Sequence, residues 1–206
     1  MTKTLVVKYV PRGERSNTRK ILEEFKSRVK NSTIEELDLT KDVPDLFLSD
    51  NLMAYISRDY LGQSLPPEQK SLLTKMDKMT EQVKSADMVV LAYPMFNFSM
   101  PAAVKAWFDS IMLKGHTWDA KDGSYAGLMQ GKKALTIVSS GGAYSTGPMK
   151  AWEHALSLSN AEFQFMGFSE VKGVLAEAMN RDEDTKASNF AKAIKDIHAI
   201  AHDWYG

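Results

Sequence analysis

Short apolar runs of strand length alternate along the chain with longer segments whose apolar residues recur at helical spacing. The pattern predicts strands at 5–10, 34–39, 88–93, 135–140 and 171–176, and helices at 16–29, 51–61, 68–85, 102–113, 148–163 and 182–204. Strands and helices that alternate in this way form parallel sheets joined by right-handed crossovers. We therefore expect an α/β fold, one domain over residues 1–206, with helices on both faces of the sheet.

The polarity of the runs indicates where each strand lies in the sheet. Runs 88–93 and 135–140 are almost wholly apolar, which is typical of strands buried on both faces, whereas run 34–39 alternates with charged residues and suits an edge strand. In doubly wound sheets, ligands bind beyond the carboxyl ends of the strands, where the strand order reverses. The candidate site therefore lies after the first, third and fourth runs.

The segment after the first run combines hydroxyl, amide and guanidinium groups. Arg12 precedes Ser16, Asn17 and Thr18, which open a predicted helix. A helix N-terminus offers unpaired N–H groups and a partial positive charge, so this segment predicts an anion site. It matches neither the dinucleotide fingerprint nor the P-loop. A simple N-cap with solvated arginines is the alternative.

The loop after the third run is unusually apolar for a loop of a soluble protein. It reads Pro94, Met95, Phe96, Asn97 and Phe98. Such a loop covers something apolar, and a flat aromatic ligand with the Asn97 amide on its polar atoms would account for it. A loop folded onto the core, or a dimer interface, are the alternatives.

A glycine pair follows the fourth run, in the order Ser139, Ser140, Gly141 and Gly142, with Tyr144 just beyond. Paired glycines let the backbone approach a ligand closely, although a tight turn without a ligand would show the same glycine pair. The three loops together match flavin mononucleotide (FMN), which has a phosphate, a polar chain and a flat tricycle. Strand order 2-1-3-4-5 places FMN at the first and third strands.

Composition excludes several classes of protein. The 26 basic and 26 acidic residues balance, so no basic face for nucleic acid or for an anionic membrane is expected. Cysteine is absent, which rules out disulfides and thiolate chemistry. No apolar run has the length of a membrane span or of a secretory signal, and we expect a cytoplasmic protein.

Several motifs carry a resemblance to a known family over nearly the whole chain. Two of these motifs have two parts, residues 11–12 followed by 16–19 and residues 94–98 followed by Pro101. The others are residues 105–109, 115–118, 131–134 and 139–142. In these motifs the sequence resembles the FMN-dependent NADH:quinone oxidoreductases of the flavodoxin-like superfamily. These enzymes are also called FMN-dependent NADH-azoreductases. The resemblance implies a three-layer sandwich around a five-stranded parallel sheet of order 2-1-3-4-5.

The resemblance also implies a cofactor site and a reaction. FMN would be bound by Arg12, Ser16, Asn17, Thr18, Pro94, Met95, Phe96, Asn97, Phe98, Ser139, Ser140, Gly141, Gly142 and Tyr144. Two electrons would pass from NADH or NADPH through FMN to quinones, azo compounds or nitroaromatics in a ping-pong cycle. Members of the family are homodimers in which aromatics of the partner roof the flavin, and Tyr55, Tyr60, Trp118 and Tyr125 are the candidates here.

No catalytic side chain and no metal site are predicted, because cofactor chemistry of this kind needs from the protein binding, orientation and electrostatics. His198 and His202 share a helix face but lack the glutamate and third ligand of a zinc motif. The alternative function is a flavodoxin-type FMN-binding electron carrier or interaction protein. Such carriers are usually strongly acidic, which the balanced charge does not match. A flavin-free binding domain would leave the apolar 95–100 loop unexplained.

Overall fold

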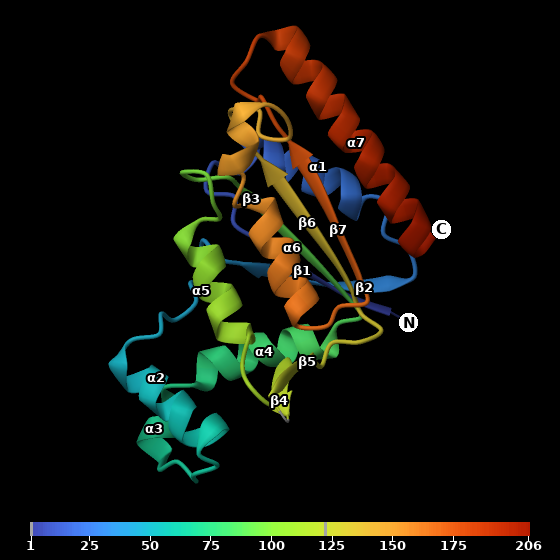
Figure 1. Ribbon diagram of the computed structural model, residues 1–206. Coiled ribbons are helices and arrows are strands. Elements are labelled where there is room, and N and C mark those ends of the chain that lie inside the picture. Colours follow the sequence, from blue (N-terminus) through green and yellow to red (C-terminus); the bar gives the residue numbers. More distant parts are fainter. Residues whose placement is uncertain (1, 122) are drawn as a thin grey trace.

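The computed structural model describes residues 2–121 and 123–206, and its centre is a five-stranded parallel sheet (Figure 1). The strands are β1 (Thr2–Lys8), β2 (Ser32–Asp38), β3 (Met88–Pro94), β6 (Lys133–Ser139) and β7 (Glu170–Ala176). Their order is β2-β1-β3-β6-β7, and every neighbouring pair is parallel. Because β6 and β7 are the fourth and fifth strands of this sheet, the predicted order 2-1-3-4-5 is confirmed.

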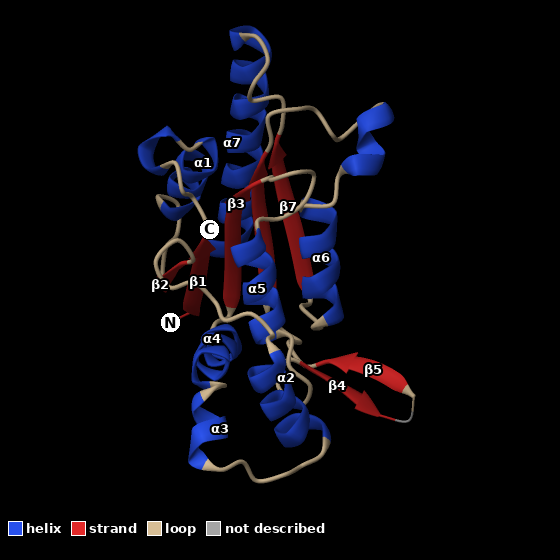
Figure 2. Ribbon diagram, turned by 90° about the vertical axis from the view of Figure 1, so that its left-hand side faces the viewer, coloured by secondary structure: helices blue, strands red, loops and turns tan. Residues whose placement is uncertain are grey.

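Helices cover the sheet on both faces, as the alternation of elements predicts. On one face lie α1 (Asn17–Lys26) and α7 (Glu183–Tyr205), and on the other lie α4 (Thr74–Ser85), α5 (Ala102–Ile111) and α6 (Leu156–Phe165) (Figures 1 and 2). Shorter elements join them: η1 (Gly13–Arg15), α2 (Ser49–Tyr55), η2 (Ile56–Tyr60), α3 (Pro67–Ser71) and η3 (Pro148–Trp152).

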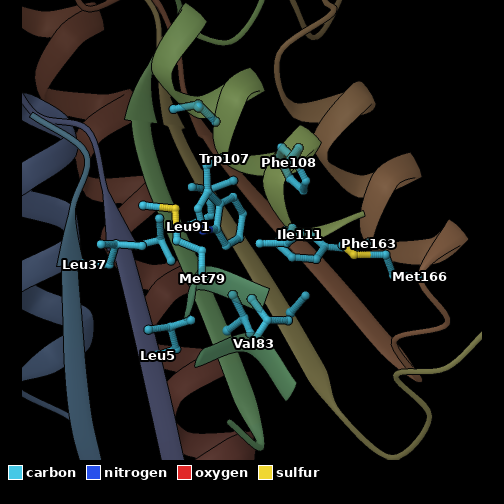
Figure 3. Close-up of a cluster of buried hydrophobic side chains, with 14 of the residues drawn as sticks. Leu5, Leu37, Met79, Val83, Leu91, Trp107, Phe108, Ile111, Phe163 and Met166 are labelled. Carbon is cyan, nitrogen blue, oxygen red and sulfur yellow. The ribbon is translucent and has the colours of Figure 1, made fainter. Parts of the chain in front are cut away.

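Each helical layer forms its own hydrophobic core with the sheet. Trp107, Phe108 and Phe163 fill the core under α4, α5 and α6, against Leu5 and Leu91 of the central strands (Figure 3). These five side chains are fully buried. Burial of such large side chains supplies most of the stability of the fold and holds the strand ends in place.

Two predicted helices are divided in the structure. The segment 68–85 breaks at Leu72 and Leu73 into α3 and α4. The segment 148–163 breaks at Glu153, whose carboxylate accepts hydrogen bonds from the backbone N–H groups of Ala155 (2.9 Å) and Leu156 (2.7 Å). A carboxylate that satisfies the free N–H groups of a helix start acts as its cap, so α6 begins after Glu153.

A two-stranded hairpin, β4 (Trp118–Lys121) and β5 (Ser124–Gly127), is absent from the sequence prediction. It projects from the end of the sheet opposite to the carboxyl ends of the parallel strands (Figure 2). Gly127 lies against Gly167, since a Cβ at Gly127 would be only 2.3 Å from the Gly167 nitrogen. This close approach ties the hairpin to the end of α6. Within the described ranges, no helix is both long and apolar enough to cross a membrane.

Candidate functional site

The loops that follow β1, β3, β6 and β7 meet around one cavity of about 180 Å³. It lies where the order of the strands reverses, because the chain passes from β1 to β2 on one side and returns to β3 on the other. Its walls are Pro11, Arg12, Ser16, Asn17, Pro94, Met95, Phe96, Ser139, Ser140, Gly141, Met179 and Asn180. A ligand site is expected at this position in an open α/β sheet.

The start of α1 forms the first wall of the cavity. Ser16 is the N-cap, and its Oγ accepts a hydrogen bond from the N–H of Arg19 (3.2 Å). The next N–H groups of the helix, those of Asn17 and Thr18, have no acceptor among the described residues. Two unpaired N–H groups at the positive end of a helix form a binding position for an anion.

Thr18 connects the first wall to the second rather than facing the cavity. Its buried hydroxyl lies 2.6 Å from the hydroxyl of Ser139 at the end of β6. The backbone carbonyl of Ser139 in turn accepts from the N–H of Met95 (2.8 Å). A chain of buried hydrogen bonds thus fixes three of the loops relative to one another.

Thr18→Val is expected to lower the free energy of unfolding by about 1–3 kcal/mol, because it leaves the buried Ser139 hydroxyl without this partner. The double variant Thr18→Val with Ser139→Ala should lose less than the sum of the two single variants, since neither change then leaves a polar group behind. Urea unfolding of the four proteins measures the coupling. Strict additivity would mean that the two hydroxyls do not interact.

The loop after β3 supplies the apolar wall through Pro94, Met95 and Phe96. It then turns sharply. The N–H of Phe96 donates to the Ser99 carbonyl (2.9 Å), and the N–H of Ser99 donates to the Phe96 carbonyl (3.0 Å). The two central residues, Asn97 and Phe98, have φ of 47° and 72°. A left-handed conformation is costly for a phenylalanine, and strain of this kind gathers at functional loops.

This turn directs Phe98 away from the cavity. Its ring packs against Trp152 (centroids 4.9 Å apart) and Tyr144 (6.1 Å). Phe96, by contrast, meets Tyr9 edge to face at 6.0 Å and keeps its position in the cavity wall. The turn therefore separates the two phenylalanines of one motif into different environments.

The glycine pair after β6 presents backbone N–H groups. The N–H groups of Gly141 and Gly142 have no acceptor among the described residues, and the Ser140 hydroxyl donates to the Gly142 carbonyl (2.9 Å). These N–H groups can stabilise negative charge on a ligand.

Glu177, just after β7, holds the continuation of this loop. Its carboxylate accepts from the N–H groups of Tyr144 (2.6 Å) and Ser145 (2.8 Å) and from the Ser145 hydroxyl. Burial alone would raise the pKa of Glu177, but these hydrogen bonds outweigh it and leave the pKa below its ordinary value. The carboxylate therefore stays ionised at neutral pH and keeps the loop in place.

Comparison with known proteins identifies the family of the chain. A model of the flavodoxin-like fold matches residues 2–201. A protein of Coprothermobacter proteolyticus named FMN-dependent NADH:quinone oxidoreductase is 31% identical, and the alignment covers 98% of each chain. The chain belongs to this flavodoxin-like family.

Other members of the family are similar along their whole length. An FMN-dependent NADH:quinone oxidoreductase of Vibrio parahaemolyticus is 28% identical over 98% of this chain and 100% of its own. The crystal structure of an FMN-dependent NADH-azoreductase of Bacillus anthracis in complex with FMN superposes with a TM-score of 0.88, at 26% identity and full coverage of both chains.

The structure brings most of the predicted flavodoxin-family site residues together. Those that line the cavity are Arg12, Ser16, Asn17, Pro94, Met95, Phe96, Ser139, Ser140 and Gly141. Outside its lining are Thr18, Asn97, Phe98, Gly142 and Tyr144. Tyr144 instead lines a separate cavity of about 410 Å³ beside β7.

Three lining residues, Pro11, Met179 and Asn180, were not among the predicted site residues. Pro11 follows β1, whereas Met179 and Asn180 follow β7, a strand whose carboxyl end was not among the predicted positions of the site. The polar residues that follow Ala176 were the available signal, because every strand of a parallel sheet ends at the same edge.

The predicted roof aromatics lie far from this cavity within the same chain. Trp118 and Tyr125 belong to the β4–β5 hairpin at the opposite end of the sheet (Figure 2), where they pack with Phe165. Tyr55 is buried, and its hydroxyl accepts from the N–H of Lys114 (2.9 Å), so it is part of a core. Tyr125 is 71% exposed and is free to contact a second molecule.

Proposed function

We propose that this protein is an FMN-dependent oxidoreductase that passes two electrons from NADH to quinones, and also to aromatic azo compounds and nitroaromatics. The observation that carries the proposal is the convergence of three features on one cavity. These are the unpaired N–H groups of α1, the apolar loop after β3 and the loop after β6 with Gly141. An anion site, an apolar wall and backbone donors are what a flavin with a phosphate requires.

The phosphate end of FMN fits the start of α1. The N–H groups of Asn17 and Thr18 would donate to its oxygens, and Arg12, Ser16 and Asn17 line the cavity. The positive end of the helix dipole favours the dianion by about 0.3–2 kcal/mol in addition to these hydrogen bonds.

The ring of FMN fits between the apolar loop and the glycine pair. Met95 and Phe96 would contact it through van der Waals surface, while the N–H groups of Gly141 and Gly142 would meet its polar edge. The cavity of about 180 Å³ is smaller than the roughly 300 Å³ or more of ordinary small-molecule sites. Part of the flavin would therefore remain uncovered by this chain and open to other molecules.

Bound FMN supplies the two-electron chemistry, and the chain supplies position and charge stabilisation. The N–H groups of Gly141 and Gly142 are fixed donors toward the negative charge that reduction brings to the pyrimidine side, an effect of a few kcal/mol at comparable sites. Glu177 holds the loop that carries them. No side-chain acid or base takes part in this scheme, since water can protonate the product.

The uncovered face of the flavin would serve both substrates. NADH and the electron acceptor are flat, and each would occupy the same stacking position in turn, which gives ping-pong kinetics. A second copy of the chain would complete this position. Its β4–β5 hairpin carries exposed Tyr125, which can roof the site of its partner but not the site of its own chain.

Anaerobic mixing of FMN-loaded protein with NADH, followed by benzoquinone, tests the function. We expect consumption of NADH at a rate that depends on FMN, and parallel initial-velocity lines when both substrates are varied. Protein that ignores added FMN, or holds it without any reaction with NADH, would refute the proposal.

The runner-up function is a flavodoxin-type electron carrier. The 26 acidic and 26 basic residues give no acidic face for docking to a basic redox partner. Photoreduction separates the two functions. A reductase should bleach directly by two electrons, whereas a carrier should accumulate long-wavelength absorbance half-way through the reduction.

A further inference from the structure

The segment after β7 is held rigidly against the glycine loop of the candidate site. Three backbone hydrogen bonds join them, from Ala178 N–H to the Gly142 carbonyl (2.8 Å), from Met179 to Ser140 (3.0 Å) and from Asn180 to Gly141 (3.1 Å). They lie beyond the ends of β6 and β7 and do not follow the register of those strands. The backbone of this segment therefore has a fixed place relative to the cavity.

Ala178 begins a turn that places Asn180 at the cavity. Its φ is 62°, a left-handed conformation that alanine rarely adopts, and its carbonyl accepts from the N–H of Arg181 (3.0 Å). Strain that the surrounding structure maintains often marks a functional position. Here the strained residue lies two positions before a polar side chain in the cavity wall.

The Asn180 side chain occupies space that only a glycine at 141 leaves open. A Cβ on Gly141 would lie 2.4 Å from Nδ2 of Asn180. The Asn180 side chain is exposed and makes no hydrogen bond to the described residues, so its two donors and one acceptor are open to a ligand. It lines the cavity together with Arg12, Ser16 and Asn17.

We propose that Asn180 is a further FMN-binding residue, which donates from its side-chain amide to the phosphate of the cofactor. The inference rests on the proposed function, since it assumes that FMN binds in this cavity. Asn180 shares the cavity with Arg12, Ser16 and Asn17, which the proposed function assigns to the phosphate, and it adds a neutral donor from the β7 side. Its backbone is fixed before FMN binds by the hydrogen bond to Gly141, so only the side chain has to be ordered on binding.

Flavin binding to the apoprotein tests the assignment without reference to activity. Dissociation constants for FMN and for riboflavin, which lacks the phosphate, would be measured by quenching of flavin fluorescence. We expect Asn180→Ala to weaken FMN binding by about 10- to 100-fold, the loss of one hydrogen bond to a charged group. Asn180→Asp should weaken it further, because a carboxylate repels the phosphate, while riboflavin binding changes by less than about twofold.

Two controls separate a contact from a structural role. Ser188→Ala on the exposed side of α7 should leave both constants unchanged, and Asn180→Ser, which keeps a donor, should recover part of the loss. FMN constants within twofold of wild type for both Asn180→Ala and Asn180→Asp would overturn the inference, as would equal losses of FMN and riboflavin. Wild-type apoprotein that binds no FMN would instead overturn the proposed function, and this inference with it.

Discussion

Asn17→Pro is expected to weaken FMN binding by about 10- to 100-fold, which corresponds to the loss of a charge-assisted hydrogen bond. Asn17 is the first residue of α1, and its N–H has no acceptor among the described residues. Proline lacks this N–H, yet it is favoured at the first position of a helix because its φ matches. Ser16 before it is extended (φ −81°, ψ 122°), a conformation that a following proline accepts.

The backbone contribution can be isolated with Asn17→Ala as the matched control. Alanine removes the side chain and keeps the N–H, so it should cost only a few-fold in FMN affinity. Both variants should unfold at about the same urea concentration, and riboflavin should not distinguish them. Equal FMN affinities of the proline and alanine variants would show that this N–H does not hold the phosphate.

Glu162→Gln is expected to remove a pH dependence of stability that a buried carboxyl group causes. Glu162 on α6 is 8% exposed, and the Lys105 Nζ lies 3.6 Å from its carboxylate. Lys105 also pairs with Asp109, and Glu162 Oε2 has no hydrogen-bond partner among the described residues. Burial raises the pKa of Glu162 to about 7, and Asp109 adds to this rise while Lys105 opposes it.

The sign of the effect follows from proton binding. Between pH 4.5, the ordinary pKa, and about 7, the folded protein holds a proton on Glu162 that the unfolded chain has lost. The stability due to this group is thus fully present below pH 4.5 and is lost as the pH rises through 7. Glutamine mimics the protonated form, so at pH 8 the variant should be more stable than wild type by up to ~3 kcal/mol.

Urea unfolding at pH 4.5 and pH 8 measures this difference. The two proteins should have similar stability at the lower pH and diverge at the higher one. Glu183→Gln, on an exposed side chain at the start of α7, is the control and should change little at either pH. A constant difference between wild type and Glu162→Gln would mean that Glu162 is ionised throughout the range.

The sheet could be predicted from sequence because its strands are short and apolar, and because the segments between them have apolar residues at helical spacing. Runs 88–93 and 135–140 read as doubly buried strands, and both lie in the middle of the sheet. The β4–β5 hairpin could not be found from apolar pattern, since its strands are only four residues long and partly exposed. The Asp122–Gly123 dipeptide in the sequence was the one available sign of it.

The site could be predicted only at the level of loops. The residues of three loops were found from the ends of their strands, but the side chains that line the cavity depend on backbone angles. Asn97 and Phe98 adopt left-handed φ, which turns them from the wall that Met95 and Phe96 form. Asn180 was missed because the carboxyl end of β7 was not among the predicted positions of the site, although the turn at Ala178 brings it to the cavity.

The central claim is that the cavity at the strand ends binds FMN in a form that reacts with NADH. The absorption spectrum of the purified protein with FMN, recorded without oxygen before and after NADH, tests it most directly. We expect a protein-bound flavin spectrum that NADH bleaches and that a quinone restores. A protein whose presence leaves the spectrum of free FMN unchanged, or whose bound flavin keeps its colour with excess NADH, would contradict the claim.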